Sequence, residues 1–565
     1  MKKRILIVGG VAGGATAAAR VRRLAADAEV IMFERGPHVS FSNCSLPYYL
    51  SGTVSDSEKL VMMSPEKFKK SYDIEARVNS EVLSINRGEK TIQVKNLISG
   101  ETYTEAYDKL VLSPGASPMR PRSIVGVDKP HVFTVRNVKD IEALKAYIDE
   151  NTLQEVCVIG GGFIGIEVAE NLNIAGKRVS IVEATNQILA PFDYDMVQIL
   201  HKEIINHGIN LHVEDAVMEI TDQEVRLASG TAISAQVVVL AIGVAPETKL
   251  AQDAGLRIGQ TRCIWVDHNY RTSDSDIYAV GDAIEVVQAI TGKPTRLSMA
   301  GPALRQARNA ADDIFGISNR VNGVIGSFAV RLFKMNAAAT GMTTKAAEAA
   351  GIPADFVYLI SNDKVGIMPD VHPIHFKLVF EVPTGRVLGA QAIGMGEVAK
   401  RIDVVATLIR MHGTLEDLKD LELCYSPIYS TARDVTNLSA LVATNILYGR
   451  FRQVPVSSVR ELVESGAAII DVREENEYAA GHLKTAVNIP LSQLRSRMDE
   501  IPRDRPVYLH CRSSQRSYNA ICALQGNGFD NLYNISGSFL GISLFEYYND
   551  IRLKREPIVT AYNFK

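Results

Sequence analysis

Two glycine-rich turns, each between an apolar strand and a helix, constrain the fold of this chain more than any other feature. The cleaner copy, EVCVIGGGFIGIEVAENLNIAGKRVSIVE, places Gly160, Gly162 and Gly165 after one predicted strand, and Glu183 ends the next. Glycines let the backbone approach a pyrophosphate at a helix N-terminus, and the acidic residue accepts hydrogen bonds from ribose hydroxyls. The pattern predicts a dinucleotide site, and Glu183 favours NADH because it would repel the 2′-phosphate of NADPH.

The other copy, KRILIVGGVAGGATAAARVRRL, gives the same strand, turn and helix at the start of the chain. Gly9 and Gly14 occupy the first and third glycine positions, Val11 stands at the second, and Glu34 ends the next strand. Two such units predict an α/β protein with two Rossmann-like dinucleotide-binding domains. A chain of 565 residues also has room for further domains.

Two more motifs carry a resemblance to a known family. LVLSPGASP contains Ser113 and Gly115, and the strand in TSDSDIYAVGDA leads directly to Asp282. With the two glycine turns, these motifs follow the order of the flavoprotein disulfide reductases, which the chain resembles from Met1 to about Tyr448. The resemblance implies FAD, bound by Gly9, Gly14, Glu34, Arg35, Asn43, Ser113, Gly115 and Asp282, and NADH, bound by Gly160, Gly162, Gly165 and Glu183.

The resemblance also divides this part of the chain. An FAD-binding domain takes residues 1–118 and 246–325, and an NADH-binding domain, 119–245, is inserted between its two parts. An α+β dimerisation domain follows at 326–448. The family resemblance therefore implies a homodimer.

A lone cysteine, Cys44 in SFSNCSLPYY, follows the first dinucleotide unit. Disulfide-reducing members of the family carry a pair there, spaced C-x-x-C or C-x4-C. A single cysteine can cycle through sulfenic acid, as in NADH peroxidases and oxidases, or form a mixed disulfide with an external thiol, as in coenzyme A-disulfide reductases. Ala12 stands where the peroxidases and oxidases have histidine. The chain thus resembles the coenzyme A-disulfide reductase branch, with Cys44 as its catalytic residue.

In that branch, the first helix and the cysteine loop contact coenzyme A. Carried over by position, the candidate ligands are Thr16, Arg20, Arg23, Ser40 and Asn43. Arg20 and Arg23 lie one turn apart on the predicted helix, as two guanidinium groups that hold phosphates would need. The alternative is an ordinary solvated basic face.

The branch also uses two tyrosines that the partner subunit contributes to the disulfide site. Tyr425 in LCYSPIYS matches one of them, which implies a catalytic role; the alternative is a half-buried interface tyrosine. At the other position, VGIMPD places Ile367 and Met368. A hydroxyl that could protonate a leaving thiolate is therefore missing, which predicts slow reduction of coenzyme A disulfide and room for a different substrate.

The character of the sequence changes after the dimerisation domain. DVREENEYAAGH, NIP and the strand that leads into HCRSSQRS follow the order of a rhodanese domain, which residues 454–565 resemble. Cys511 opens a loop that ends at Arg516 before a predicted helix, so backbone N–H groups, Arg512 and Arg516 favour a thiolate and then a persulfide. The alternatives are a cysteine phosphatase, which generally needs a longer loop and an acid aspartate, and a degenerate docking domain, which would have no need of Cys511.

Composition excludes several other classes. The formal net charge of −3 gives no reason to expect nucleic acid, and no apolar run approaches the roughly 20 residues that span a bilayer. No His/Cys cluster has metal-ligand spacing. We expect a cytoplasmic protein with no metal and with neither a nucleic acid nor a membrane as its partner.

The sequence therefore predicts a flavoprotein that uses NADH to reduce persulfides or polysulfides, such as coenzyme A persulfide, and releases hydrogen sulfide. The rhodanese domain would supply sulfane sulfur through Cys511. Three rivals remain: a coenzyme A-disulfide reductase, opposed by Ile367 and Met368; an NADH oxidase or peroxidase, opposed by Ala12; and a non-enzymatic redox carrier that hands sulfur from Cys511 to a partner protein.

Overall fold

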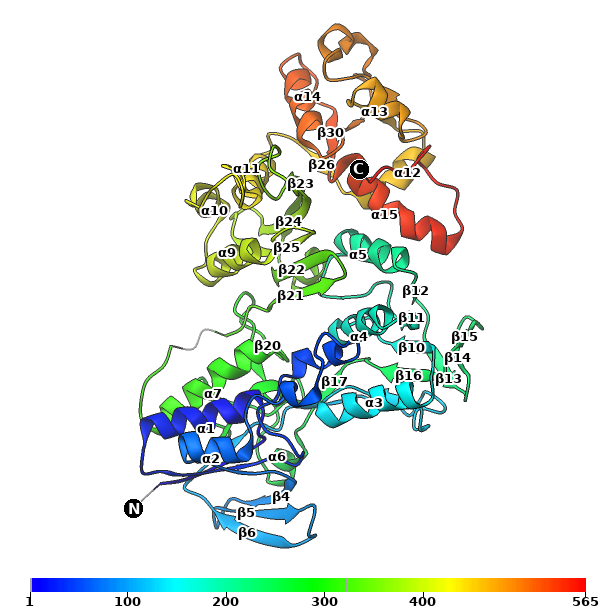
Figure 1. Cartoon of the computed structure of the whole chain (residues 1–565). Helices are drawn as coiled ribbons and strands as arrows, with labels where there is room; N and C mark the ends of the chain where they lie inside the picture. Colours follow the sequence, from blue (N-terminus) through cyan, green and yellow to red (C-terminus); the bar gives the residue numbers. More distant parts are fainter. Residues whose placement is uncertain (1–2, 321–322, 565) are drawn as a thin grey trace. The chain divides into compact units, whose positions relative to one another are not determined.

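The computed structural model describes residues 3–320 and 323–564. The chain forms two units, each made of two separate stretches of sequence (Figure 1). Unit 1 consists of residues 1–186 and 212–324, and unit 2 consists of residues 187–211 and 325–565.

The first sheet of unit 1 is parallel, with the strand order β18-β7-β1-β2-β3. Its strands are β1 (Arg4–Val8), β2 (Glu29–Phe33), β3 (Glu75–Arg77), β7 (Lys109–Leu112) and β18 (Ile277–Ala279). Helix α1 (Ala12–Leu24) packs against β1 and β2 and lies beside α7 (Ala300–Ile314) (Figure 1). Strand β1 is apolar throughout its interior because both faces are covered: Leu6 belongs to one core and Ile5 to the core on the other side.

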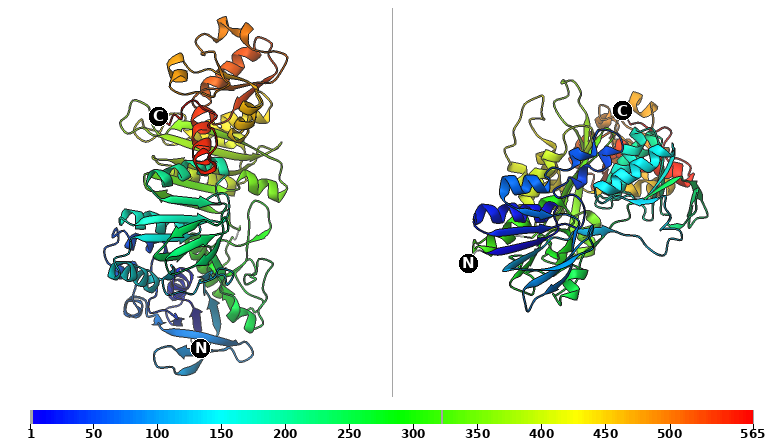
Figure 2. Two further views of the ribbon diagram at one scale, coloured as in Figure 1. Left: turned by 90° about the vertical axis from the view of Figure 1, so that its right-hand side faces the viewer. Right: turned by 60° about the horizontal axis from the view of Figure 1, so that its bottom comes forward.

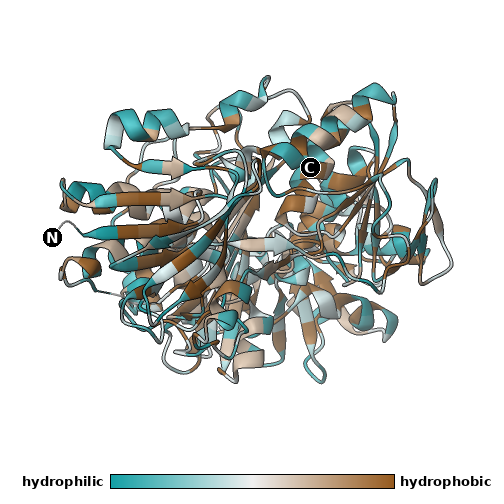
Figure 3. Ribbon diagram, turned by 90° about the horizontal axis from the view of Figure 1, so that it is seen from below, coloured by the Kyte–Doolittle hydropathy of each residue, from teal (hydrophilic) through white to brown (hydrophobic). Residues whose placement is uncertain are grey.

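The second sheet of unit 1 is built in the same way, with the order β12-β11-β10-β16-β9. Its strands are β9 (Val132–Thr134), β10 (Glu155–Ile159), β11 (Arg178–Glu183), β12 (Asn210–Val213) and β16 (Val237–Leu240). Helix α4 (Phe163–Ile174) packs on β10 and β11, and α3 (Val138–Glu150) packs on β9. Seen in Figure 3, the strands of the parallel sheets are largely hydrophobic, as strands covered by helices must be.

Smaller antiparallel sheets complete unit 1. One contains β4 (Ser80–Asn86), β5 (Thr91–Asn96) and β6 (Thr102–Ala106), drawn in light blue in Figure 2, and another contains β13 (Val217–Ile220), β14 (Glu224–Leu227) and β15 (Ala232–Ser234). Two strand pairs join β8 (Ala116–Pro118) to β17 (Val244–Pro246) and β19 (Val286–Val287) to β20 (Pro294–Thr295). The remaining helices are α2 (Pro65–Tyr72) and α6 (Lys249–Asp253). The chain connects the two parallel sheets twice, once through β8 and once through β17, and these two strands pair with each other.

Unit 2 contains an antiparallel sheet with the order β21-β22-β25-β24-β23. Its strands are β21 (Ser327–Leu332), β22 (Met335–Gly341), β23 (Ala354–Asn362), β24 (Pro373–Glu381) and β25 (Val387–Gly394). The helices around it are α5 (Tyr194–Asn206), α8 (Thr344–Ala350), α9 (Ala399–Arg410), α10 (Leu415–Asp420) and α11 (Val435–Leu447). Helix α5 is fixed to this sheet by a buried ion pair, because the Lys377 ammonium on β24 lies 2.8 Å from the Asp195 carboxylate.

The last part of unit 2 is a parallel sheet with the order β26-β30-β29-β27-β28. Its strands are β26 (Gln453–Val454), β27 (Ala468–Asp471), β28 (Val487–Asn488), β29 (Val507–His510) and β30 (Leu532–Ile535). Its helices are α12 (Val459–Glu464), α13 (Glu475–Ala479), α14 (Gln515–Gln525) and α15 (Ser538–Leu553). The buried ion pair between Asp471 and Arg473, 2.6 Å, lies at the end of strand β27.

Helix α15 joins this C-terminal sheet to the rest of unit 2. It packs along α5 (Figure 1), where the Tyr194 hydroxyl donates to Asn549 Oδ1 at 2.8 Å. The Tyr548 hydroxyl donates to the Leu211 carbonyl oxygen at 3.0 Å, at the end of the same segment. The C-terminal sheet is therefore held to its neighbours by side-chain contacts as well as by the chain connection.

The predicted fold class is confirmed: two Rossmann-like sheets, an α+β region and a C-terminal α/β region. The exact domain boundaries stay a prediction. Residues 187–211, which lie within the predicted NADH-binding domain, pack in unit 2, and no motif in the sequence indicated this. Among the described residues, no helix is both long and apolar enough to cross a membrane.

Candidate active sites

The first glycine turn joins β1 to α1 by close backbone contacts. Gly9 has φ of +96°, and a Cβ there would overlap the Ser113 carbonyl oxygen. A Cβ on Gly14 would overlap the Gly9 carbonyl oxygen, so both positions require glycine. Val11 lies directly before α1, at the place that Gly162 occupies before α4. Open space surrounds Gly162, so no contact with the described residues requires glycine there.

Glu34 follows β2 and faces this turn. Its Oε2 accepts the Gly10 N–H at 2.9 Å, and its Oε1 accepts the Gly36 N–H at 2.8 Å. The two hydrogen bonds fix the carboxylate beside the glycine turn, and each oxygen keeps a lone pair for another donor. This is the arrangement expected of a ribose ligand.

Glu183 repeats this geometry at the second turn. Its Oε2 accepts the Gly161 N–H at 2.8 Å, and its Oε1 accepts the Thr185 N–H at 2.8 Å. Gly160 has φ of +109°, and a Cβ on Gly165 would overlap the Gly160 carbonyl oxygen. The two turns are therefore built alike, and both fit a dinucleotide.

Asp282 lies just after β18, in a short 3₁₀ turn. Its half-buried carboxylate accepts no hydrogen bond from the described residues, and burial raises its pKa. Nearby, the Gly13 Cα faces the Ser113 hydroxyl so closely that a Cβ would not fit. A carboxylate without a donor at the end of a parallel sheet fits a hydroxyl-bearing chain such as the ribityl group of FAD. Gly115, with φ of +73°, has open space around it.

The other two predicted FAD ligands contact the segment that leads into the second sheet. Asn43 Nδ2 donates to the Arg136 carbonyl oxygen at 3.2 Å. Arg35 forms an ion pair with Glu247 at 2.7 Å. Both side chains are therefore already engaged with the protein.

Cys44 is exposed, in the short 3₁₀ turn Asn43–Ser45. Partial burial of its thiol raises its pKa, and the carboxylates of Glu167 and Asp282 raise it further. Glu167 belongs to α4 of the second dinucleotide unit, whereas Asp282 follows the sheet of the first. Within unit 1, the fold thus brings this cysteine between the two predicted dinucleotide sites.

Glu167 is a site residue that the sequence analysis did not single out. Burial, with a contribution from Glu170, raises its pKa to about 7. A carboxyl group that titrates near neutral pH beside a thiol can take up or release a proton during turnover. The sequence did contain a signal for Glu167: it is a carboxylate just after the glycine turn, in an otherwise apolar stretch of the helix.

The predicted coenzyme A ligands are only partly free to bind phosphates. Arg20 Nε lies 2.5 Å from Asp312 Oδ1 of α7, so this guanidinium is already paired. Arg23 is exposed and lies 5.7 Å from the centre of the Tyr72 ring. Thr16 and Ser40 are half-buried. Arg23 is thus the more accessible of the two arginines.

The predicted partner-facing loops lie in unit 2. Tyr425 is 49% exposed and Ile367 is 85% exposed. The two loops contact each other, because the Val365 N–H donates to the Pro427 carbonyl oxygen at 3.3 Å. They present exposed apolar and aromatic side chains together, as a surface that a second subunit covers would.

Cys511 follows β29 and is 1% exposed. Helix α14 begins four residues later, and Arg516 on it forms a bidentate pair with Glu477 at 2.6 and 2.8 Å. The pKa of Arg512 is lowered by burial, with Arg473 and Arg516 adding to the effect. Arg512 and Arg516 therefore both lie near the sulfur, and Glu477 balances the charge of Arg516.

Two serine hydroxyls approach this sulfur and a third approaches one of them, and the sequence analysis missed all three. Ser517 Oγ lies 3.8 Å from Cys511 Sγ, and Ser538 Oγ lies 4.0 Å from it. Ser514 Oγ lies 3.1 Å from Ser538 Oγ. Ser514 and Ser517 stand within or beside the quoted loop, but Ser538 comes from the start of α15.

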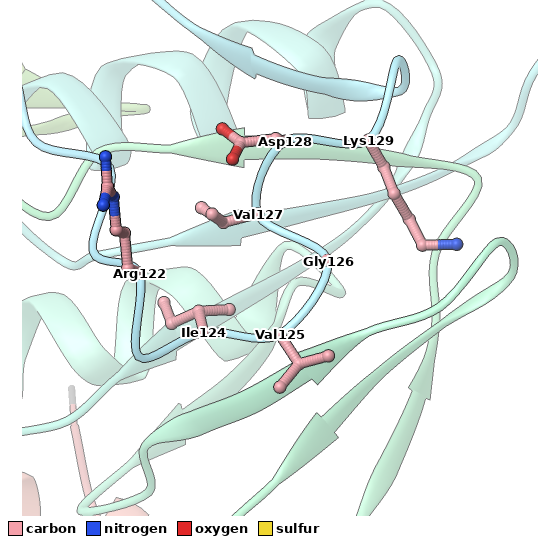
Figure 4. Close-up of a pocket in the computed structure, with 7 residues that line it drawn as sticks. All are labelled: Arg122, Ile124, Val125, Gly126, Val127, Asp128 and Lys129. Atoms are coloured by element: carbon pink, nitrogen blue, oxygen red, sulfur yellow. The ribbon is translucent and has the colours of Figure 1, made fainter.

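A separate hollow of about 480 Å³ lies along the loop of residues 122–129 (Figure 4). Arg122, Asp128 and Lys129 are its charged lining residues, and Lys129 pairs with Asp222. None of the predicted site residues lines this hollow. Among the described residues, no three His, Cys, Asp or Glu side chains gather in a way that could hold a metal ion.

Comparison with known families matches three stretches of the chain. Residues 3–312 match the family described as pyridine nucleotide-disulphide oxidoreductase, and residues 328–435 match its dimerisation domain. Residues 456–544 match the rhodanese-like domain.

Several known proteins are similar over most of the chain. A coenzyme A disulfide reductase of Staphylococcus epidermidis is 32% identical over 436 residues, which cover 77% of this chain and 98% of that protein. The crystal structure of reduced Bacillus anthracis CoADR-RHD is 42% identical, with a TM-score of 0.94 over 96% of this chain and 98% of that one. A NAD-dependent persulfide reductase from A. fulgidus is 33% identical, with a TM-score of 0.90 over 96% and 99%.

Proposed function

Because the chain belongs to the pyridine nucleotide-disulphide oxidoreductase family and carries a rhodanese-like domain, we propose that it reduces persulfides or polysulfides to hydrogen sulfide. In this proposal the electrons come from NADH by way of FAD. Coenzyme A persulfide is the proposed substrate. One observation supports this most: a lone Cys44 between two dinucleotide turns shares its chain with Cys511, a buried cysteine beside Arg512 and Arg516. The six cysteines are free thiols, in keeping with a cytoplasmic location.

Bound FAD, with NADH, would supply the electron pair that the reaction consumes. The Cys44 thiolate attacks the inner sulfur of coenzyme A persulfide, so a disulfide forms between Cys44 and coenzyme A, and hydrosulfide leaves as the S–S bond of the persulfide breaks. The electron pair returns Cys44 to its thiolate, and coenzyme A leaves as the thiol after taking up one proton.

The proposed role of Cys511 requires no net electrons. Its thiolate attacks the outer sulfur of a donor such as thiosulfate, a new S–S bond forms, and sulfite leaves. A coenzyme A thiolate then attacks the outer sulfur of the Cys511 persulfide, which gives coenzyme A persulfide and returns the Cys511 thiolate. The two cysteines thus catalyse successive steps, and coenzyme A carries sulfur between them.

The exposed loops of unit 2 belong to this proposal. The match to a dimerisation domain supports a homodimer, in which Tyr425 would reach Cys44 of the other subunit. Ile367 and Met368 offer no hydroxyl at the second tyrosine position. A persulfide needs less help than a disulfide, because hydrosulfide is a less basic leaving group than a coenzyme A thiolate.

The deciding experiment compares two substrates under anaerobic conditions. NADH oxidation by the purified chain is measured with coenzyme A persulfide and with coenzyme A disulfide, and sulfide is assayed in both. We expect faster turnover with the persulfide and one sulfide released for each NADH consumed. Preference for the disulfide, with no sulfide, would contradict the proposal.

That second result would favour the other candidate function, a coenzyme A-disulfide reductase. Two observations support it: Tyr425 is present, and a similar protein of Staphylococcus epidermidis is a coenzyme A disulfide reductase. The intact Cys511 loop argues against it, because reduction of coenzyme A disulfide includes no step in which sulfane sulfur is transferred.

Replacing Glu183 with alanine should reduce the preference for NADH over NADPH. The carboxylate loses its place beside the ribose, so hydrogen bonds to the 2′-hydroxyl and repulsion of a 2′-phosphate disappear together. We expect the ratio of kcat/KM for the two cofactors to fall on the order of tenfold or more. Glu155→Ala, at the opposite end of the neighbouring strand β10, is the control. An unchanged ratio in Glu183→Ala would contradict the assignment of this residue.

A further inference from the structure

Two serines around Cys511 have backbone conformations that favour glycine. Ser514 has φ of +76° and Ser538 has φ of +48°. Only a few per cent of non-glycine residues have positive φ, and each such position costs backbone strain. Ser538 is fully buried and Ser514 is nearly so, so neither hydroxyl serves as a solvent contact.

Both strained serines direct their hydroxyls to the same place. Ser538 Oγ accepts the Cys511 N–H at 3.3 Å and lies 3.1 Å from Ser514 Oγ. A hydroxyl has two acceptor sites and one donor. The Ser514 hydroxyl has two acceptors within reach, Ser538 Oγ and the Ile535 carbonyl oxygen at 3.4 Å. When it donates to Ser538 Oγ, Ser538 accepts two hydrogen bonds and keeps its own proton for an acceptor.

Two acceptors compete for that proton. The Ile535 carbonyl oxygen lies 3.4 Å from Ser538 Oγ, and Cys511 Sγ lies 4.0 Å from it. A charged acceptor makes a hydrogen bond roughly twice as strong as a neutral one. A negative charge on the sulfur, as a thiolate or as a persulfide anion, makes it the stronger acceptor of the two.

The start of α15 also contacts the antiparallel sheet of unit 2, through Tyr358 on β23. Gly537, directly before Ser538, packs on the Tyr358 ring so closely that a Cβ would overlap it. The Tyr358 hydroxyl lies 2.7 Å from His375 Nδ1, and both residues are buried. The residue before Ser538 is thus in close contact with a buried, hydrogen-bonded side chain.

We propose that Ser514 and Ser538 are part of the sulfur-transfer site: they hold a relay of hydroxyl groups that stabilises negative charge on the Cys511 sulfur. This inference rests on the proposed role of Cys511 as an acceptor of sulfane sulfur. It goes beyond that role because it explains why serine, and not glycine, occupies two positions whose backbone conformation favours glycine.

Four variants of the full chain test the relay. Ser538→Gly removes the hydroxyl and the strain together, whereas Ser538→Ala removes the hydroxyl and keeps the strain. Ser514→Gly does the same as Ser538→Gly at the other position. Ser543→Ala is the control, because Ser543 is also fully buried on α15 but its hydroxyl has no hydrogen-bond partner among the described residues.

The readouts are the single-turnover rate of sulfur transfer from thiosulfate to Cys511, followed by the intact mass of the protein, and the thermal midpoint Tm. We expect Ser538→Gly to lose on the order of tenfold in rate, as for one hydrogen bond to a charged group, with an equal or higher Tm. Ser538→Ala should lose as much in rate and also lower the Tm. Ser514→Gly should lose rate without loss of Tm, and Ser543→Ala should keep the rate.

A wild-type rate in Ser538→Gly would overturn the relay, because it would show that sulfur transfer does not need the hydroxyl group. Loss of rate in Ser538→Ala alone would lead to the same conclusion. Failure of the unaltered chain to take up sulfur from thiosulfate or from polysulfide would instead contradict the proposed function of Cys511. The failure of the inference and the failure of the function are thus separate results.

Discussion

Replacing Cys44 with serine is expected to lower NADH-driven reduction of coenzyme A persulfide by at least about 10³-fold, in line with the removal of other enzymatic nucleophiles. A serine hydroxyl is not ionised at neutral pH and cannot form a disulfide with coenzyme A. The measurement is anaerobic NADH oxidation together with the release of sulfide.

The controls for Cys44→Ser separate lost chemistry from lost structure. Cys522→Ser replaces another exposed cysteine and should keep the wild-type rate. Bound flavin, followed by its absorbance, should be equal in the unaltered chain and in both variants. If Cys44→Ser oxidised NADH with persulfide at the wild-type rate, Cys44 would not be the nucleophile.

Cys511→Ala is expected to have the reciprocal effect. Transfer of sulfur from thiosulfate to coenzyme A should be undetectable, because alanine cannot carry a persulfide. Reduction of preformed coenzyme A persulfide by Cys44 should continue at the wild-type rate, since Cys44 and Cys511 lie in different units. Both activities are measured on the same preparation, once with thiosulfate and coenzyme A and once with the persulfide added directly.

The two cysteine variants also decide between an enzyme and a redox carrier. A carrier that hands sulfur to a partner protein should show little turnover with a small persulfide, whether or not Cys511 is present. Saturating turnover by Cys511→Ala, with no added protein, would exclude the carrier. If Cys511→Ala lost both activities while Cys522→Ser kept both, coenzyme A would not be a freely diffusing intermediate.

The parts of the sites that follow local rules could be predicted from sequence. The glycine turns and Glu183 follow from fixed spacing within a strand, a turn and a helix, and the structure shows the close contacts that require Gly9 and Gly14. Val11 breaks the pattern at the place where, in the second turn, Gly162 has open space around it.

Contacts between distant segments could not be predicted in this way. Arg20 stands on the correct helix for a phosphate ligand, yet its partner Asp312 lies almost 300 positions away. Ser538 approaches Cys511 only because α15 begins beside the end of β29. Glu167 was visible within the quoted motif, but its effect on Cys44 depends on how α4 meets the cysteine loop.

The pairing of α5 with α15 has a consequence for the synthesis of the chain. Tyr194 and Asn549, which join the two helices, are 355 positions apart. At about 5 to 20 residues per second, a ribosome needs roughly 20 to 70 s between them. During that time, the apolar side of α5 has no α15 to cover it and is open to aggregation or to a chaperone. A chain cut before α15 would leave this side of α5 uncovered permanently, so the reductase part should be hard to produce without α15.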